Sequence, residues 1–278
     1  MTTRSVSATI ESMRALEGAG FPVRRPFPTP RVPQIDPFLL LDEMGPEDLA
    51  PGEAKGAPDH PHRGFETVTY VISGAVEHED SAGHAGRIGP GAVQWMTAGS
   101  GVIHSEMPSR EMRSDGGRQH GFQLWVNLPA VDKMMPPRYQ EFREGEIPQV
   151  REDGVVVRVI AGSYHGTSGP VETRSPVGYL HVTLDPGAEV RLTAPADQTA
   201  LAYTFAGDGD GTLQVYADDG DELALRNDGT GVSEHLVLTG APLREPVARY
   251  GPFVMNTGAE IEQAISDYQS GRFGAIAR

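Results

Sequence analysis

The sequence predicts an all-β fold of short strands that form a sandwich or a barrel. Glycine accounts for 34 of the 278 residues and proline for 23, which implies many turns without the composition of a disordered chain. Strand-like segments also recur at roughly ten-residue spacing with turn signals between them, as in sandwiches and barrels. A chain of this length can bury one large core or two compact ones.

The strand pattern begins at residue 67. Residues 67–72, Thr-Val-Thr-Tyr-Val-Ile, are rich in β-branched and aromatic side chains and are closed by Ser73 and Gly74. Residues 94–97 form the next expected strand. Residues 122–128 alternate, which places every second side chain on one face. Further strands are expected at residues 155–160, 179–184, 201–205, 212–216 and 235–238.

The two ends of the chain have patterns of their own. Residues 12–17 predict a short helical turn, whereas the repeated prolines of residues 21–33 exclude a helix there. Near the other end, Thr257 and Glu260 form a possible capping box. The apolar positions of the helix that follows are Ile261, Ala264, Ile265 and Tyr268, and Gly271 ends it. We expect this helix to pack against a barrel and to be purely structural.

The chain divides into two halves that resemble each other. Residues 128–149 are charged, marked by prolines and without alternation, so we expect a connecting segment with a boundary near residues 135–145. The predicted domains are residues 1–138 and 139–278. The sequence Tyr-Val-Ile-Ser-Gly at residues 70–74 resembles Tyr-Thr-Phe-Ala-Gly at residues 203–207, as a duplicated barrel would.

Charge and composition exclude several classes of function. Lys and Arg number 23 against 38 Asp and Glu, a net charge of −15, and a chain this acidic should repel a phosphate backbone. The absence of cysteine excludes disulfides, iron–sulfur clusters, thiolate nucleophiles and cysteine-ligated zinc. The apolar stretches are too short to cross a membrane, and the N-terminus lacks the apolar core of a signal peptide. We therefore expect a soluble, cytoplasmic protein that does not bind nucleic acid directly.

Four residues in two pairs predict a metal site. His60 and His62 lie two residues apart, as do His104 and Glu106, and alternate residues of a strand project to the same side. Three imidazoles and one carboxylate suit Fe, Mn, Ni, Cu or Zn rather than Ca or Mg. Glu66 lies an even number of residues after His60 and His62, so on one strand it would face the same side. The residues alone do not decide whether Glu66 or Glu106 is the carboxylate ligand.

The remaining histidines are expected to have no functional role. His78 and His84 lie beside acidic residues and glycines, so we expect solvated turn or hairpin positions. His120 precedes the strand at residues 122–128, and His181 lies on the face opposite the apolar residues of its strand.

Several longer blocks together resemble the pirin family of the cupin superfamily, from about Gly20 to Phe273. The blocks are Asp59–Tyr70, His78–Ser81, Gln94–Gly99, His104–Pro108, Phe122–Leu128, Lys133–Met135, Pro242–Pro246 and Gly251–Thr257. One departure is Ala92, where pirins commonly have aspartate after Pro-Gly; it removes a turn carboxylate and no ligand.

The resemblance implies a bicupin, two antiparallel jelly-roll barrels with a short C-terminal helix and a metal only in the first barrel. Its ligands would be His60, His62, His104 and Glu106, and Glu66 would orient a ligand. In the second half, the positions equivalent to residues 60, 62 and 66 hold Thr193, Pro195 and Thr199. His165, His181 and His235 include no pair at i, i+2 spacing, which agrees with a barrel that holds no metal.

The resemblance also implies a metal-dependent dioxygenase of the quercetin 2,3-dioxygenase type. Such an enzyme opens a flavonol or a similar enolisable substrate with O₂ on one divalent transition metal, first of all Fe(II), with Mn, Ni, Cu or Zn as alternatives. Glu106 would be both ligand and base, and Phe65 and Met96 would belong either to the pocket wall or to the core. The alternative is a metal-dependent regulatory protein that binds a transcription factor or a metabolic enzyme. The sequence does not decide between them, nor does it give the oligomeric state.

Overall fold

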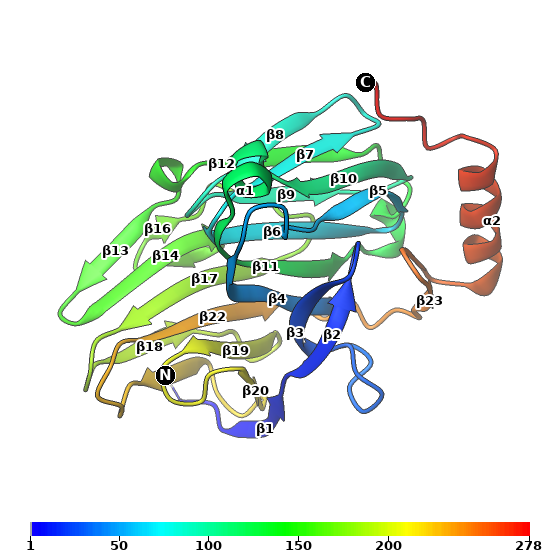
Figure 1. Ribbon diagram of the computed structural model, residues 1–278. Coiled ribbons are helices and arrows are strands. Elements are labelled where there is room, and N and C mark those ends of the chain that lie inside the picture. Colours follow the sequence, from blue (N-terminus) through cyan, green and yellow to red (C-terminus); the bar gives the residue numbers. More distant parts are fainter. Residues whose placement is uncertain (1) are drawn as a thin grey trace. The chain divides into compact units, whose positions relative to one another are not determined.

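The computed structural model describes residues 2–278, which group into two compact units. The first unit comprises Arg14–Arg25, Phe38–Glu144 and Leu243–Arg278; the second comprises residues up to Met13, Pro26–Pro37 and Gly145–Pro242. Both are mainly β-structure (Figure 1). The domains predicted as residues 1–138 and 139–278 stay a prediction, since compactness does not establish which segments fold independently.

The first unit contains a seven-stranded and a four-stranded antiparallel sheet. The larger sheet has the spatial order β12 (Arg138–Phe142), β9 (Val93–Thr97), β6 (Phe65–Ser73), β11 (Gly117–Asn127), β4 (Phe38–Leu49), β3 (Phe21–Phe27) and β2 (Met13–Glu17). The smaller sheet has the order β5 (Ala57–His62), β10 (Val102–Pro108), β7 (Val76–Asp80) and β8 (Ala85–Ile88). The remaining elements are the β23 (Ala248–Tyr250) and β24 (Phe253–Met255) pair, α1 (Arg110–Asp115), α2 (Gly258–Gln269) and two 3₁₀ turns at Ala130–Asp132 and Glu144–Glu146.

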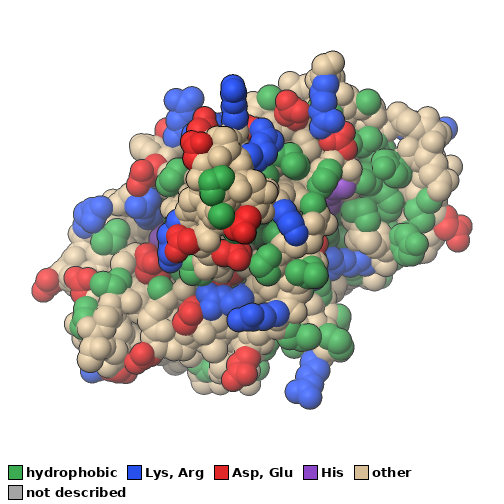
Figure 2. Space-filling model, in the orientation of Figure 1, with side chains coloured by type: hydrophobic (Ala, Val, Ile, Leu, Met, Phe, Trp, Pro, Cys, Tyr) green, Lys and Arg blue, Asp and Glu red, His purple; other side chains and the backbone are tan. Residues whose placement is uncertain are grey.

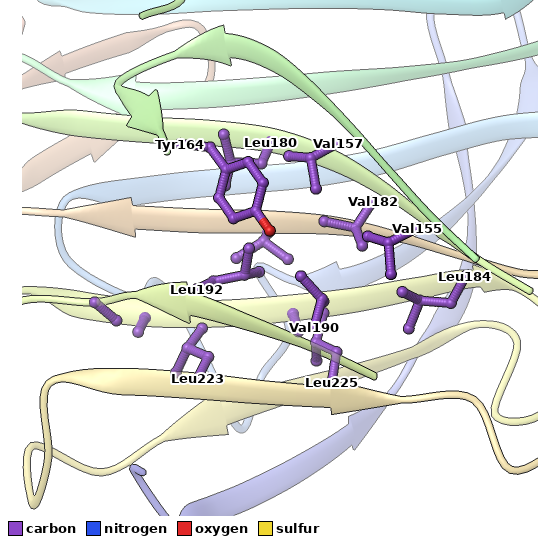
Figure 3. Packing of buried hydrophobic residues seen from close by; sticks show 14 of the residues in the cluster. Val155, Val157, Tyr164, Leu180, Val182, Leu184, Val190, Leu192, Leu223 and Leu225 are labelled. Carbon is purple, nitrogen blue, oxygen red and sulfur yellow. The ribbon is translucent and has the colours of Figure 1, made fainter. Parts of the chain in front are cut away.

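The second unit is also built on a seven-stranded antiparallel sheet. Its order is β1 (Val6–Glu11), β20 (Thr212–Tyr216), β19 (Thr199–Ala206), β22 (Ser233–Gly240), β17 (Val177–Leu184), β14 (Val155–Ala161) and β13 (Gln149–Glu152). The smaller pairs are β18 (Glu189–Thr193) with β21 (Glu222–Arg226) and β15 (Ser163–Tyr164) with β16 (Thr167–Ser168). Alternating apolar residues of β14, β17, β18 and β21 interdigitate in the core that Figure 3 shows, with Val157, Val182 and Leu223 fully buried.

The two large sheets confirm the predicted duplication. Tyr70 lies on β6, between β9 and β11, and Tyr203 lies on β19, between β20 and β22. Both side chains are buried. The matching pentapeptides therefore occupy the same place in two similarly ordered sheets, as expected for two cupin domains.

The predicted strands are all present, but the helical turn predicted for residues 12–17 is wrong. Met13–Glu17 form β2, the edge strand beside β3. The helical preference of this segment is overridden because pairing with β3 supplies more backbone hydrogen bonds than a single helical turn could form. Likewise, β12 lies inside the expected connecting segment and pairs with β9.

The C-terminal helix α2 lies where it was predicted, but Tyr268 of the expected apolar face is exposed. Thr257 and Glu260 form the capping box, and Ile261 and Ala264 are buried against a cluster that includes Phe253. No helix within residues 2–278 is long and apolar enough to cross a membrane. Acidic and basic side chains are interspersed over the face in Figure 2.

Candidate metal centre and its cavity

Two neighbouring strands of the small sheet bring the predicted residues together. His60 and His62 lie on β5, His104 and Glu106 lie on β10, and the strands pair antiparallel with His104 opposite His60. The register shifts between His104 and Glu106, so that Glu106 lies opposite Ala57. A β-bulge of this kind redirects side chains at the sheet edge.

The three histidines form a compact cluster. One candidate ligand atom of each lies within 4.8 Å of those of the other two. The ring centroids are 4.7 Å apart for His60 and His62, 4.3 Å for His60 and His104, and 4.8 Å for His62 and His104. Imidazoles this close, from two strands, can share one metal ion.

The nitrogen atoms of this cluster fit a metal. Within residues 2–278, neither ring nitrogen of His62 or of His104 has a hydrogen-bond partner, although both side chains are buried. Burial, and then the neighbouring histidines, hold the pKa of both rings well below 6.5, so both are neutral with a lone pair available. The His60 Nδ1 lies 2.7 Å from the Pro58 carbonyl, which favours a proton on Nδ1 and leaves Nε2 free.

Glu106 lies beside the cluster but is not a member of it. Its Oε1 accepts a hydrogen bond from the Thr69 hydroxyl at 2.5 Å, and its Oε2 accepts one from the Gln123 amide at 2.9 Å. Glu106 is nearly buried and lines the same cavity as His60 and His62. The carboxylate is therefore held at the cavity wall by two neutral donors.

The cavity has a volume of about 530 Å³, within the range of small-molecule sites. Its wall is part apolar and part charged. Among the residues that line it are His60, His62, Thr69, Glu106, Gln123, Trp125, Arg25 and Arg249. Phe65 and Met96 do not line it: Phe65 packs with Leu39 and Val254, and Met96 with Ala98 and Val102, so both belong to the core.

The expectation for one further histidine has a clear outcome, and the role expected of Glu66 stays a prediction. The solvated position predicted for His78 is wrong, because β7 packs beside β10 and buries the ring 5.3 Å from that of His104. The rings of His78 and His84 both contact Asp80, at 3.3 Å and 2.9 Å. Burial of Asp80 is outweighed by these hydrogen bonds, which lower its pKa to about 2. Glu66 is buried and accepts a hydrogen bond from Thr97 at 2.7 Å.

Sequence reasoning missed the residues that support the site. Thr69 and Gln123 each alternate with apolar neighbours, but their strands carry other polar residues too, so no local signal singles them out. Lys133 is almost fully buried, and its Nζ donates to the Gly64 carbonyl, the Asn127 side chain and the Val254 carbonyl at 2.7, 2.7 and 3.0 Å. No local pattern distinguishes that lysine from an exposed one.

Two barrel-type units and a histidine cluster on paired strands define a bicupin. The comparisons with known proteins are more specific, and the chain belongs to the pirin family. The pirin family model matches residues 20–126, and the model of the pirin C-terminal cupin domain matches residues 179–274.

The relatives span nearly the whole chain. Human pirin is 42% identical, over 98% of this chain and 95% of its own length. A pirin-like protein of Solanum lycopersicum is 45% identical, over 93% of this chain and 89% of its own. A crystal structure of quercetin 2,3-dioxygenase from Acinetobacter baumannii superposes with a TM-score of 0.92 at 40% identity, covering 99% of this chain and all of that one.

Proposed function

We propose that the protein is a metal-dependent dioxygenase of the quercetin 2,3-dioxygenase type. The observation that carries this proposal is the cluster of three histidines, two of them buried without hydrogen-bond partners, beside a cavity of about 530 Å³ with a carboxylate in its wall. The similarity to the Acinetobacter enzyme supports the same reaction class.

His60, His62 and His104 would hold the ion, with Glu106 as the fourth ligand. One divalent transition metal would polarise a substrate hydroxyl as a Lewis acid and supply the redox chemistry with O₂. Fe(II) is our first assignment, and the nitrogen-rich donor set also accommodates Mn, Ni, Cu or Zn.

Glu106 would take the proton of the substrate hydroxyl. Each carboxylate oxygen accepts one hydrogen bond from Thr69 or Gln123 and retains a further lone pair. These two donors fix the orientation of the carboxylate, so that it can serve as a positioned base. The substrate class that this chemistry fits is a flavonol or a similarly enolisable aromatic compound.

The test is metal-dependent turnover. The protein, stripped of metal and reconstituted anaerobically with Fe(II) or another divalent ion, should consume quercetin only after O₂ is added. Loss of the flavonol absorbance and release of carbon monoxide would be measured together, with the His60→Ala, His62→Ala double variant as the control.

Stoichiometric metal without turnover of any flavonol would contradict the proposal. It would favour the alternative, a metal-dependent regulatory protein that binds a transcription factor or a metabolic enzyme. That alternative predicts protein partners whose capture depends on the bound metal.

A further inference from the structure

The charges around the cavity differ from those of the whole chain. The chain carries a net charge of −15, yet the cavity wall is balanced, with three cations, Arg25, Lys55 and Arg249, and three carboxylates, at residues 17, 59 and 106. Arg25 is neutralised by ion pairs with Glu17 and Asp42. Across the part of the chain that the structure describes, neither Lys55 nor Arg249 forms an ion pair with a carboxylate.

Arg249 is the cation that lies near the histidine cluster. Its Cζ lies 4.9 Å from the ring centre of Trp125, and the centre of the same indole ring is 5.2 Å from that of His62. The two separations place the guanidinium within about 10 Å of the His62 ring. Arg249 therefore lines the same cavity as His60 and His62.

The guanidinium has donors to spare. One of its N–H groups donates to the Leu39 carbonyl at 3.3 Å, out of the five that an arginine carries. Burial, and then the neighbouring charge of Arg25, lower the pKa of Arg249. An anion beside Arg249 would offset both effects, and the contact with the Trp125 ring holds the guanidinium at the cavity wall.

We infer that the cavity selects planar hydroxylated aromatic compounds that carry a carboxylate, which pairs with Arg249 while the hydroxyl end lies at the histidine cluster. This inference rests on the proposed function and adds the substrate class to it. A carboxylate is the favoured anion because its two oxygens match the planar guanidinium fork. Lys55, exposed before β5, would act only at long range by attracting anions to the opening.

A matched pair of ligands tests the inference by binding alone. The metal-reconstituted protein would be titrated without oxygen with 3-hydroxyflavone and with its 4′-carboxy derivative. Trp125 lines the cavity and Trp95 is fully buried in the core, so quenching of tryptophan fluorescence reports on occupancy. The carboxylated ligand should bind about 10- to 100-fold more tightly, the usual effect of a charge-assisted hydrogen bond. This advantage should shrink as salt is added.

The variants separate Arg249 from other cations. Arg249→Gln should abolish the preference, because an amide cannot pair with a carboxylate as a guanidinium does, and the two ligands should then bind this variant with affinities within about 3-fold of each other. Arg14→Gln removes an exposed cation outside the cavity and should leave the preference intact. Equal affinities in the unaltered protein, no binding of either ligand, or loss of the preference in Lys55→Gln but not in Arg249→Gln would overturn the inference. Failure of flavonol turnover would instead overturn the proposed function, since binding is measured without oxygen.

Discussion

The histidines of the cluster show how burial prepares a ligand set. Four ring nitrogens of His62 and His104 are buried without hydrogen-bond partners among residues 2–278. Leaving a buried polar atom unpaired costs about 1–3 kcal/mol, so such atoms are rare unless something else satisfies them. A transition metal would satisfy one nitrogen of each ring, and the low pKa of both rings keeps protons from competing with it.

Replacement of His60 and His62 by alanine should remove the metal and preserve the fold. Two of the expected four donors are lost. The apolar core of the second unit is untouched, and the first unit loses only the ring contacts of His62 with Phe65 and Trp125. Metal content after dialysis, measured by elemental analysis, should fall to background, and the β-sheet circular dichroism should persist. Full occupancy in the double variant would rule out this ligand assignment.

Glu106→Gln should separate proton transfer from metal binding. The amide keeps the size and one oxygen acceptor but loses the negative charge and the basicity. Turnover at saturating metal should fall by roughly 10²- to 10⁴-fold, the usual contribution of a positioned base, while metal occupancy changes much less. Glu262→Gln, at an exposed carboxylate of α2 outside the cavity, is the control and should keep the turnover of the unaltered protein. Equal turnover of Glu106→Gln and the unaltered protein at matched metal content would assign the proton to another group.

His235 should make the second unit sensitive to acid. Burial, and then the charge of His181, lower its pKa from 6.5 to about 4. Between these pH values the unfolded chain binds more protons than the folded one, so the free energy of unfolding decreases as pH falls from 6.5 to 4. The loss from this group is about 3 kcal/mol. His235→Gln should flatten this part of a urea-denaturation profile against pH, whereas exposed His165→Gln should not; an unchanged slope would contradict the prediction.

At the scale of elements, one lysine joins the turn after β5 to β24. Lys133 donates to the carbonyls of Gly64 and Val254, and a Cβ at Gly64 would lie 2.0 Å from that same Val254 oxygen. Gly64 has φ +87°, in the left-handed region. The turn that follows His62 therefore depends on a close approach that only glycine permits and on the Lys133 ammonium, which bonds to the backbone on both sides of that approach.

Lys133→Met should loosen this connection. The methionine fills similar space but leaves the Gly64 and Val254 carbonyls without their donor, at about 1–3 kcal/mol for each buried group. We expect the free energy of unfolding to fall by roughly that sum and the metal affinity to weaken, because His62 lies two residues from Gly64. Lys55→Met, at an exposed lysine, is the matched control. Stability and metal affinity like those of this control would show that the bridge is dispensable.

At the scale of the whole molecule, two similarly ordered sheets carry different chemistry. In the second unit, His235 bonds to Thr204 and Ser233, and His181 contacts Glu234. These histidines are thus engaged with neighbouring side chains, unlike the open nitrogens of the first unit. We interpret the second unit as a duplicated copy of the first that serves as a structural scaffold.

One metal ion per chain is the corresponding prediction. X-ray absorption and anomalous scattering should place it at His60, His62 and His104. In the second unit, His181 and His235 lie on the paired strands β17 and β22 but are offset by one register position, and among the described residues no third ligand joins them. The His181→Ala, His235→Ala double variant should retain full metal content. A second ion near either residue would contradict this reading.

Local sequence patterns predicted the fold class, eight of the strands, the helix with its capping box and the three histidines that cluster. These features depend on local periodicity, on turn residues and on alternate spacing along a strand, all of which are written in consecutive residues. The sequence also predicted the duplication, because similar five-residue segments begin at Tyr70 and at Tyr203.

Other residues have roles that depend on partners far away in the sequence, and these roles are visible only in the folded chain. Met13–Glu17 became a strand through pairing with β3, His78 was buried by β10, and Glu106 was turned toward Thr69 and Gln123 by a register shift. Arg249 reaches Trp125 across 124 positions of chain, and no local pattern encodes that approach. Burial and charge at such positions are set by what the folded chain places beside them, and that depends on long-range packing.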